Sequence, residues 1–580
     1  MNTSVRFATV GLATVLASIA TATGLLAQPT PAASYATMDQ GANWTASARK
    51  DFYSRDQGSR LIPLRWIAAL KQTSGAPFLE ASLSRYGYLA NETGPVPGVP
   101  VGFTVAAGSG GPVMGMTCAA CHTRQIEVAG RSYRIDGGPA IVDFQSFLSD
   151  LDASVGNVLK SPEAFSAFAE AILGPTPSPG EKAQLRKDLE AWHLPFHTIV
   201  TAALPAPPWG PARLDAVSMI LNRVTGLDLG PPPSYLIKEN IKPADAPVRY
   251  PYIWNAAIQD QTQWPGFADN GNNILGLARN LGEVYGVFGV FHPKKASWWH
   301  LGTDYLSDNS ANFSGLEALE DLVWKLGPPK WPWPVDAALA EEGRAVFERP
   351  KAQGGCTECH GIKPGKTRFF NQKTWATPIQ DVGTDSRQYD ILEREAQTGV
   401  LSGARIPFVT EELRPVDTAF NVLRTAVIGA IVQYKLPLVS PEIQGRSAVA
   451  PRSPLTPETE ALKGAFNAPP GARAAGGGIA YESRVLEGIW ATAPYLHNGS
   501  VPTLAMLLTP VKDRASEFAI GPAYDLENVG LAAMQTKFNY KLKTTDCTAR
   551  NSGNSRCGHE WGTELTTAEK QALLEYLKVL

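Results

Sequence analysis

The sequence predicts a mainly α fold with long ordered loops and little β structure, divided into two halves. Three observations predict it: apolar residues recur at helical spacing at both ends of the second half, a short cysteine–histidine motif occurs once in each half, and a proline-rich stretch separates the halves. With 580 residues and 44% hydrophobic content, the chain is long enough for more than one packed core. Glycine (53 residues) and proline (46) exceed average usage, which favours ordered loops between the helices.

The first element is a signal peptide over residues 1–27. Arg6 is its only charge, an apolar stretch rich in Ala, Thr and Ser follows, and the segment ends in the small residue Ala27 that a signal peptidase needs. The alternative is an uncleaved membrane anchor, but the stretch is poor in large apolar residues, which favours cleavage. The sequence therefore predicts a periplasmic or secreted protein.

The rest of the chain shows neither a membrane-spanning segment nor the basic charge of a nucleic-acid-binding protein. After residue 27 no run reaches the ~18 consecutive apolar residues that a membrane span needs. The formal net charge of −2, with 18% charged residues, shows no basic excess of the kind that nucleic acids attract. We therefore expect neither a stable membrane span after signal cleavage nor a nucleic-acid partner.

The cysteine–histidine motif is CxxCH, which is typical of c-type haem attachment. Two cysteines three residues apart can form thioether bonds to the porphyrin vinyl groups, and the next histidine becomes the axial iron ligand. The alternatives are a zinc site, a redox dithiol and a disulfide, but export, repetition and the histidine after each pair all favour haem. We predict two covalently attached haem c groups, on Cys118, Cys121 and His122 and on Cys356, Cys359 and His360.

Two predicted helices flank the second motif. Asp336 is the expected cap of a helix in VDAALAEEGRAVFERP that leads into it, and Thr566 with Glu569 forms a capping box for a helix that runs to the end of the chain. The stretch GPPKWPWP at 327–334 has four prolines in eight residues, which is typical of a domain boundary. We therefore predict two cytochrome c-like haem domains, 28–326 with extended insertions and 335–580, joined by a linker at 327–334.

The sixth iron ligand decides what each haem does, because a fully ligated iron carries electrons and an open iron binds small molecules. After His122 the next histidine is His193 and the next methionine is Met219, so no close downstream residue competes for the first iron. This favours an open first haem. For the second haem, His497 in GIWATAPYLHNGS is the favoured sixth ligand and Met506 is the rival; a structural histidine is the other interpretation of His497.

The remaining two cysteines, Cys547 and Cys557, enclose a short polar loop, DCTARNSGNSRC. In an exported protein such a pair is expected to form a disulfide.

The chain resembles the bacterial di-haem cytochrome c peroxidase superfamily, and within it the branch of di-haem rubber oxygenases and di-haem fatty-acid dioxygenases. The resemblance covers most of the chain from about residue 110 to the end. CxxCH alone is generic, whereas GIWATAPYLHNGS and the GHE-containing C-terminus are specific. The matching stretches are TCAACHTRQIEVAGRSYRIDGGPA, LARNLGEVYGVFG, CTECHGIKPG, GIWATAPYLHNGSVPTL and GNSRCGHEWGTELTTAEKQALLEYLK.

The resemblance implies that His122 is the proximal ligand of a haem whose distal side takes dioxygen, and that His360 and His497 ligate a second, low-spin haem. It also implies an aromatic residue between the haems. Trp254 and Trp264 are the candidates; we favour Trp264, with ordinary core packing as the alternative for either. Peroxidases proper place a second histidine shortly after the first CxxCH, and this chain has none there.

From the motifs and the resemblance we expect an exported di-haem oxygenase, with His122 and Trp264 as its catalytic residues. Its partners would be O2 and a hydrophobic unsaturated molecule, with a long-chain unsaturated fatty acid favoured over a polyisoprenoid, and a small redox protein. The alternatives are a peroxidase that reduces H2O2 with electrons from a small cytochrome and a plain di-haem electron carrier. Arg279 and His559 are candidate partners of haem propionates.

Overall fold

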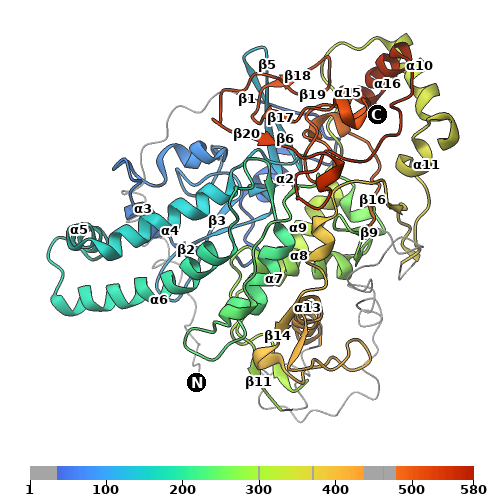
Figure 1. Cartoon of the computed structure of the whole chain (residues 1–580). Helices are drawn as coiled ribbons and strands as arrows, with labels where there is room; N and C mark the ends of the chain where they lie inside the picture. Colours follow the sequence, from blue (N-terminus) through green and yellow to red (C-terminus); the bar gives the residue numbers. More distant parts are fainter. Residues whose placement is uncertain (1–34, 298–300, 369–370, 437–461, 463–478) are drawn as a thin grey trace, which may run out of the picture.

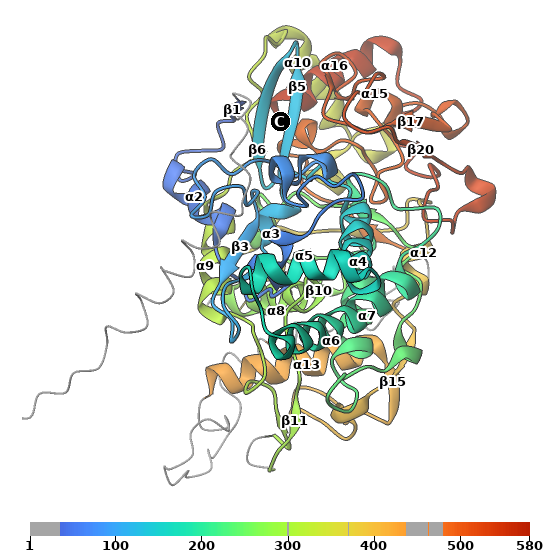
Figure 2. The ribbon, with the colours of Figure 1, turned by 90° about the vertical axis from the view of Figure 1, so that its left-hand side faces the viewer.

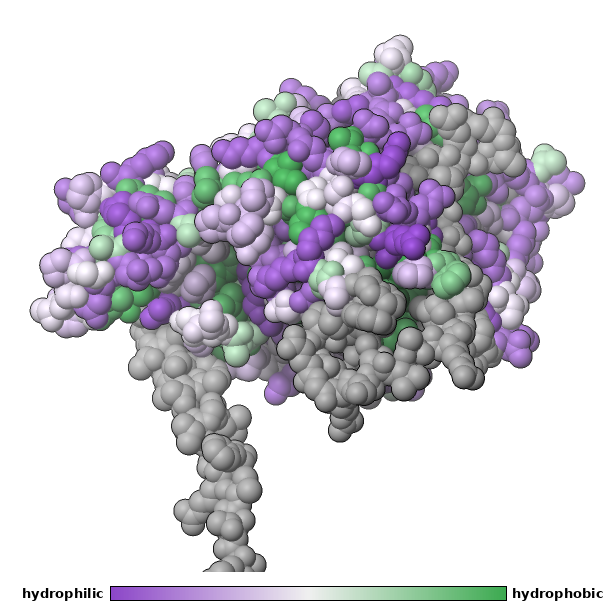
Figure 3. Space-filling model, turned by 90° about the horizontal axis from the view of Figure 1, so that it is seen from below, coloured by the Kyte–Doolittle hydropathy of each residue, from purple (hydrophilic) through white to green (hydrophobic). Residues whose placement is uncertain are grey.

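The computed structural model describes residues 35–297, 301–368, 371–436, 462 and 479–580. The predicted signal peptide lies outside these residues. Among the described residues, no helix is both long and apolar enough to cross a membrane. Figure 3 shows one face of the molecule, on which hydrophobic residues are scattered among mostly hydrophilic ones.

The α-helices differ widely in length and place. In Figure 1, α4, α5 and α6 extend from one side of the molecule, whereas α10, α11 and α16 lie toward the other. Most helices begin at a side-chain cap, such as Asp143 for α4 and Asn272 for α8. The helices are α2 (Ala46–Ser54), α3 (Leu64–Ala69), α4 (Phe144–Lys160), α5 (Pro162–Leu173), α6 (Pro179–Ala203), α7 (Ala216–Leu227), α8 (Asn273–Gly286), α9 (Phe313–Lys325), α10 (Ala337–Phe347), α11 (Thr357–His360), α12 (Arg387–Asp390), α13 (Ala419–Lys435), α15 (Leu504–Leu507) and α16 (Thr567–Val579).

Strands form nine small sheets in the described part of the chain. Two sheets have three strands, in the orders β1-β6-β5 and β2-β4-β3, and the others are antiparallel pairs. The three-stranded sheets consist of β1 (Tyr35–Thr37), β6 (Arg131–Asp136) and β5 (Thr123–Val128), and of β2 (Ile62–Pro63), β4 (Val113–Met116) and β3 (Phe103–Ala106). The pairs are β7 (Arg213–Leu214) with β8 (Val248–Arg249), β9 (Gln261–Thr262) with β10 (Ala268–Asp269), β11 (Lys294–Lys295) with β12 (Thr303–Asp304), β13 (Ile379–Gln380) with β16 (Tyr481–Glu482), β14 (Glu395–Gln397) with β15 (Val416–Thr418), β17 (Glu517–Ala519) with β20 (Lys541–Lys543), and β18 (Tyr524–Asp525) with β19 (Gly530–Leu531).

The predicted fold class, mainly α with two cytochrome c-like domains and little β structure, is wrong. The structure is 39% helical and 15% strand, and it is not clearly built from two cytochrome domains. Most strands have two or three residues, which is too short to show the alternation that predicts a strand. Several also pair with distant segments: β13 pairs with β16 about a hundred residues away. The proposed boundary at 327–334 stays a prediction.

Buried apolar side chains form three large clusters that bring distant segments together. The first joins α3, α4, α5 and α6, and the second joins α7, α8 and α13. The third contains residues from both predicted halves, including Phe52 of α2, Ile126 of β5 and Leu573 of α16. Figure 2 shows the first group of helices, α3 to α6, facing the viewer, with α13 below and α16 above them.

Both predicted helices beside the second motif are confirmed. Asp336 caps α10 by accepting hydrogen bonds from the amides of Ala338 and Leu339. Thr566 and Glu569 form the predicted capping box of α16. The predicted disulfide between Cys547 and Cys557 is also present.

Candidate functional site

Each CxxCH motif lines a cavity of its own in the described part of the chain. The first cavity is lined by Cys118, Cys121 and His122 and leaves about 1440 Å³ free of protein atoms, including its open mouth. The second cavity is lined by Cys356, Cys359 and His360 and leaves about 1300 Å³ in the same sense. The two motifs therefore open into separate spaces.

The first motif forms a tight turn between β4 and β5. Cys118–Ala120 is a single 3-10 turn, and the amide of His122 donates to the carbonyl of Cys118 at 2.9 Å. Gly102, with φ +78°, passes directly behind this turn, and a Cβ there would lie 1.9 Å from the amide nitrogen of Ala120. Only glycine satisfies both the backbone conformation and this close approach.

The ring of His122 is held through its Nδ1, which lies 2.9 Å from the carbonyl oxygen of Pro251. Burial lowers the pKa of His122 to about 4, so the imidazole is neutral at physiological pH. A neutral imidazole that donates Nδ1–H to a carbonyl has its Nε2 lone pair free to ligate a metal. This is the arrangement expected of an axial iron ligand.

The second motif repeats this design on a helical turn. The amide of Cys356 donates to the carbonyl of Phe347 at 2.9 Å, which ties the motif to the end of α10. His360 Nδ1 lies 2.8 Å from the carbonyl oxygen of Arg484, and burial lowers the pKa of His360. Both motif histidines therefore share the same second contact, a backbone carbonyl on Nδ1.

The motif cysteines are suited to thioether attachment. All four are free and half-buried. Burial raises the pKa of Cys118 and of Cys121 to about 12 and that of Cys356 to about 11, so these thiols are protonated at neutral pH. Among the described residues, the side chains that are close enough together to hold a metal ion lie elsewhere. That group of three contains none of the four motif cysteines. These residues fit covalently bound haem.

The second cavity also contains His497. This histidine is 6% exposed, and its ring stacks on Tyr481 with the centroids 3.8 Å apart. Burial, followed by the charges of Arg249 and Arg550, lowers the pKa of His497 to about 3, which again leaves a neutral imidazole. Its carbonyl accepts from the amide of Arg249 at 2.9 Å.

Met506, the rival ligand, is not among the residues that line the second cavity. It belongs to the short helix α15, and its Sδ accepts a hydrogen bond from the amide of Ala515 at 3.2 Å. His497 shares the cavity with His360, whereas Met506 does not. The structure therefore favours His497 as the sixth ligand.

A pair of variants distinguishes these two ligands. We expect His497→Ala to convert the second haem from low-spin to high-spin, because it removes the imidazole expected to be the sixth ligand. Met506→Leu keeps the packing volume and is expected to leave the spectrum unchanged. Electronic absorption and electron paramagnetic resonance of the oxidised proteins measure the haem spin state in both variants. A spin change in Met506→Leu but not in His497→Ala would reverse the assignment.

Four side chains line both cavities: Trp264, Tyr252, Glu482 and Arg484. Trp264 is 7% exposed, its Nε1 donates to the carbonyl of Arg249 at 3.2 Å, and its ring lies 6.4 Å from that of His497. These contacts place the Trp264 ring between the two spaces.

Trp254, the other candidate, lines neither cavity. It is fully buried against Tyr252, with ring centroids 4.8 Å apart, and its Nε1 donates to the carbonyl of Glu487 at 2.8 Å. These contacts describe a core residue.

The two candidate propionate partners lie in different cavities. Arg279 of α8 lines the first, where it pairs with Glu320 and donates to Asn270 Oδ1 at 2.7 Å. His559 lines the second, with its ring 6.1 Å from that of His360 and a buried Nδ1 that has no hydrogen-bond partner. The carboxylate already neutralises Arg279, whereas the Nδ1 of His559 remains available.

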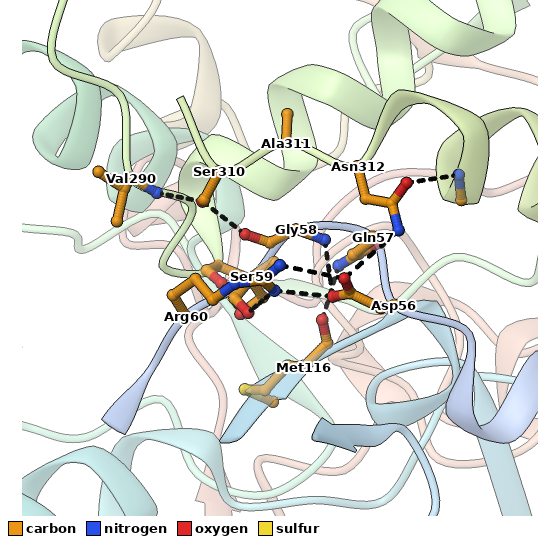
Figure 4. A network of polar contacts seen from close by, with 12 residues as sticks. Asp56, Gln57, Gly58, Ser59, Arg60, Met116, Val290, Ser310, Ala311 and Asn312 are labelled. Atoms are coloured by element: carbon orange, nitrogen blue, oxygen red, sulfur yellow. Dashed lines mark hydrogen bonds and ion pairs between the residues drawn. The ribbon is translucent and has the colours of Figure 1, made fainter. Parts of the chain in front are cut away.

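Sequence reasoning missed Gln57, which reaches the first motif from 61 residues upstream. Its Nε2 donates to the carbonyl of Met116 at 3.0 Å, and its Oε1 lies 3.6 Å from Cys118 Sγ. Figure 4 shows Gln57 within a polar network that ties residues 56–60 to Val290 and to Ser310–Asn312. No local pattern marks such a residue, because its neighbours come from distant segments.

The sequence analysis discounted Met219 for its distance along the chain, yet Met219 and also Met116 are buried and line the first cavity. Met219 comes from α7, about a hundred residues after the motif. Arg484 was missed too; it lies thirteen residues before His497, and its carbonyl holds His360.

One segment of this chain matches a known protein family. Residues 480–519, which include Arg484 and His497, match the family described as RoxA-like, cytochrome c-like. The chain is 29% identical to the uncharacterized protein y4iJ of Sinorhizobium fredii (strain NBRC 101917 / NGR234) over 93% of this chain and 92% of that protein. It is 26% identical to the uncharacterized protein y4iM of the same strain over 48% of each chain. The chain thus carries a RoxA-like, cytochrome c-like domain, which implies covalently bound haem and indicates a haem oxidoreductase.

Proposed function

We propose that the protein is an exported, periplasmic or secreted, di-haem c-type oxygenase that adds O2 to an unsaturated hydrophobic molecule. A long-chain unsaturated fatty acid, converted to a hydroperoxide, is the favoured substrate, ahead of a polyisoprenoid. The RoxA-like match supports the oxygenase class. Two separate cavities, each with its own CxxCH, support two haems.

One observation carries the proposal: the two cavities differ in their histidines. Three histidines, His360, His497 and His559, line the second cavity. Among the described residues that line the first cavity, His122 is the sole histidine. This difference fits a closed haem that carries electrons and an open haem that meets the substrate.

The walls of the first cavity suit an apolar substrate. A haem bound there supplies the dioxygen chemistry. The chain holds the imidazole of His122 in place through Pro251 and surrounds the space with side chains that exclude water. These apolar side chains are Phe144, Leu214, Val217, Ile220 and Val323.

Electrons would reach the first cavity through residues shared with the second. Trp264 lines both spaces and stays in place because Arg249 holds it twice, through its carbonyl and through its guanidinium 4.9 Å from the ring centroid. A small redox protein would supply these electrons at the second haem. The second haem would therefore set the redox state of the open iron through Trp264.

Oxygen uptake tests the proposal. We expect the purified haem-loaded protein to consume O2 with oleate, without added peroxide, and to give a product 32 mass units heavier by the addition of one O2. Stearate has the same length and no double bond, and it is the matched control that should give no uptake. Polyisoprene in place of oleate tests the second substrate. Uptake with none of the unsaturated substrates would contradict the proposal.

A second function, electron transfer alone, is favoured by Met116 and Met219. Either thioether could ligate the first iron from the cavity wall and close it. Two low-spin haems in the oxidised and reduced protein, with no lipid product, would show an electron carrier.

Rapid H2O2 reduction by a reduced cytochrome, again without lipid product, would show a peroxidase.

A further inference from the structure

A cluster of three potential metal ligands lies between α4 and α6, outside both cavities. Asp152 projects from α4, and His193 and His197 project from α6. Asp152 Oδ1 lies 2.9 Å from His193 Nε2, and Asp152 Oδ2 lies 2.9 Å from His197 Nδ1. One ligand atom from each residue can be chosen so that all three lie within 4.8 Å of one another.

The sequence spacing produces this cluster. Residues four apart on a helix share one face, so His193 and His197 present adjacent imidazoles, and their ring centroids are 5.0 Å apart. Helix α4 packs against α6 and supplies the carboxylate opposite them. Neither the first nor the second cavity is lined by any of the three.

A simple ion pair does not account for all of these contacts. His197 Nδ1 makes hydrogen bonds to Asp152. His193 Nε2 is as close to the same carboxylate, yet it is buried and makes no hydrogen bond in the geometry observed. A cation held between the carboxylate and this buried nitrogen would give both atoms a partner.

We propose that Asp152, His193 and His197 bind one Zn2+ ion that clamps α6 to α4. Two imidazoles and a carboxylate are the donor set that Zn2+ accepts, with water as a fourth ligand. Zinc bonds of about 2.1 Å place neighbouring ligand atoms about 3.4 Å apart in a tetrahedron. Asp152 Oδ1 lies 2.9 Å from His193 Nε2 and 3.1 Å from His197 Nδ1, so each of these two distances has to open by about half an ångström or less to admit the ion.

The position in α6 gives the clamp a structural purpose. Pro195 lies between the two histidines, inside a helix of 25 residues. Proline has no amide hydrogen and so removes one hydrogen bond of the helix at this turn. An ion that joins His193 to His197 bridges that weak turn and also fastens it to α4. Figure 1 shows α4, α5 and α6 extending from the body, where they have fewer neighbours to hold them.

Zinc binding to the full haem-loaded chain tests the inference. After dialysis against a chelator, the protein receives ZnCl2 and the unbound metal is removed. Mass spectrometry of the elements then gives zinc per chain, and iron from the haems reports protein loading. We expect one zinc per chain, a higher melting temperature with zinc, and an unchanged haem spectrum.

Two variants and a control locate the ion. His197→Ala and Asp152→Asn should each weaken zinc binding at least tenfold and abolish the zinc-dependent rise in melting temperature. His197 has a side chain that is 52% exposed, so its replacement leaves the packing intact. The matched control is His292→Ala, since His292 also lies beside two carboxylates, Asp228 and Asp308, away from α6. Absence of retained zinc in the parent protein, or equal retention in His197→Ala, overturns the inference. Loss of zinc in His292→Ala alone also overturns it.

Discussion

Replacement of His122 by alanine is expected to reduce oxygen uptake with oleate at least about 100-fold and to leave the low-spin signal of the second haem unchanged. Loss of an outer-shell partner of a metal ligand already costs 10–100-fold, and a direct ligand should cost at least as much. His122 is the sole histidine among the described residues lining the first cavity, so no second imidazole can replace it.

The separation of the cavities makes the expected effect selective. His122 is fixed by the carbonyl of Pro251, whereas His360 is fixed by that of Arg484. Removal of the first imidazole therefore leaves the ligands of the second haem in place. Oxygen uptake and electron paramagnetic resonance, measured on one preparation, report the two haems separately.

Controls identify the cause of any loss. Mass analysis of the intact variant shows whether both porphyrins are still attached, and His292→Ala tests removal of a histidine outside both cavities. If the His122→Ala protein carries both porphyrins and still oxygenates oleate, the reactive iron is not the one in the first cavity.

Local chemistry explains which parts of the fold could be predicted from sequence. The caps of α10 and α16 depend on residues within four positions of each other, and a sequence shows such spacings directly. The pair Cys547 and Cys557 is separated by ten residues and could be assigned once export was inferred. Each CxxCH motif is a run of consecutive residues, so the sequence also shows it directly.

Long-range pairing explains what could not be predicted. Strand β16 is two residues long, yet its Tyr481 stacks on His497 and its Glu482 lines both cavities. Its partner β13 lies about a hundred residues away, and no periodicity marks either strand. Met219 was discounted for its distance from His122 along the chain, but α7 carries it to the wall of the same cavity.

Replacement of Gly343 by alanine is expected to lower the stability of the region around the second cavity by about 2 kcal/mol or more. Helices α10 and α16 cross at Gly343, where a Cβ would lie 1.9 Å from the carbonyl oxygen of Ala572 and 2.8 Å from Tyr576 Cβ. Backbone atoms cannot rotate away, so the helices must separate. Because the clash is with backbone, its cost lies at the upper end of the usual overpacking range, about 3 kcal/mol or more, and a gain of about 1 kcal/mol in helix propensity leaves a loss of about 2 kcal/mol or more.

Gly282 of α8 is the matched control, because a Cβ there meets nothing closer than Val427 Cγ2 at 4.0 Å. Gly282→Ala is expected to be neutral or to stabilise by up to about 1 kcal/mol. Thermal unfolding followed by circular dichroism compares the two variants, and a Gly343→Ala protein as stable as Gly282→Ala would contradict the expectation.

The effect of Gly343→Ala should extend to the haem. Phe347 at the end of α10 accepts the amide hydrogen of Cys356, and Phe347, Leu573 and Leu577 line the second cavity. Separation of α10 from α16 therefore moves both the attachment motif and one wall of the cavity. We expect the low-spin signal of the second haem to weaken or to melt at a lower temperature, while the first cavity, which neither helix lines, keeps its spectrum. Such a selective change would show that a contact between two helices, far from any substrate, holds the electron-carrying haem in place.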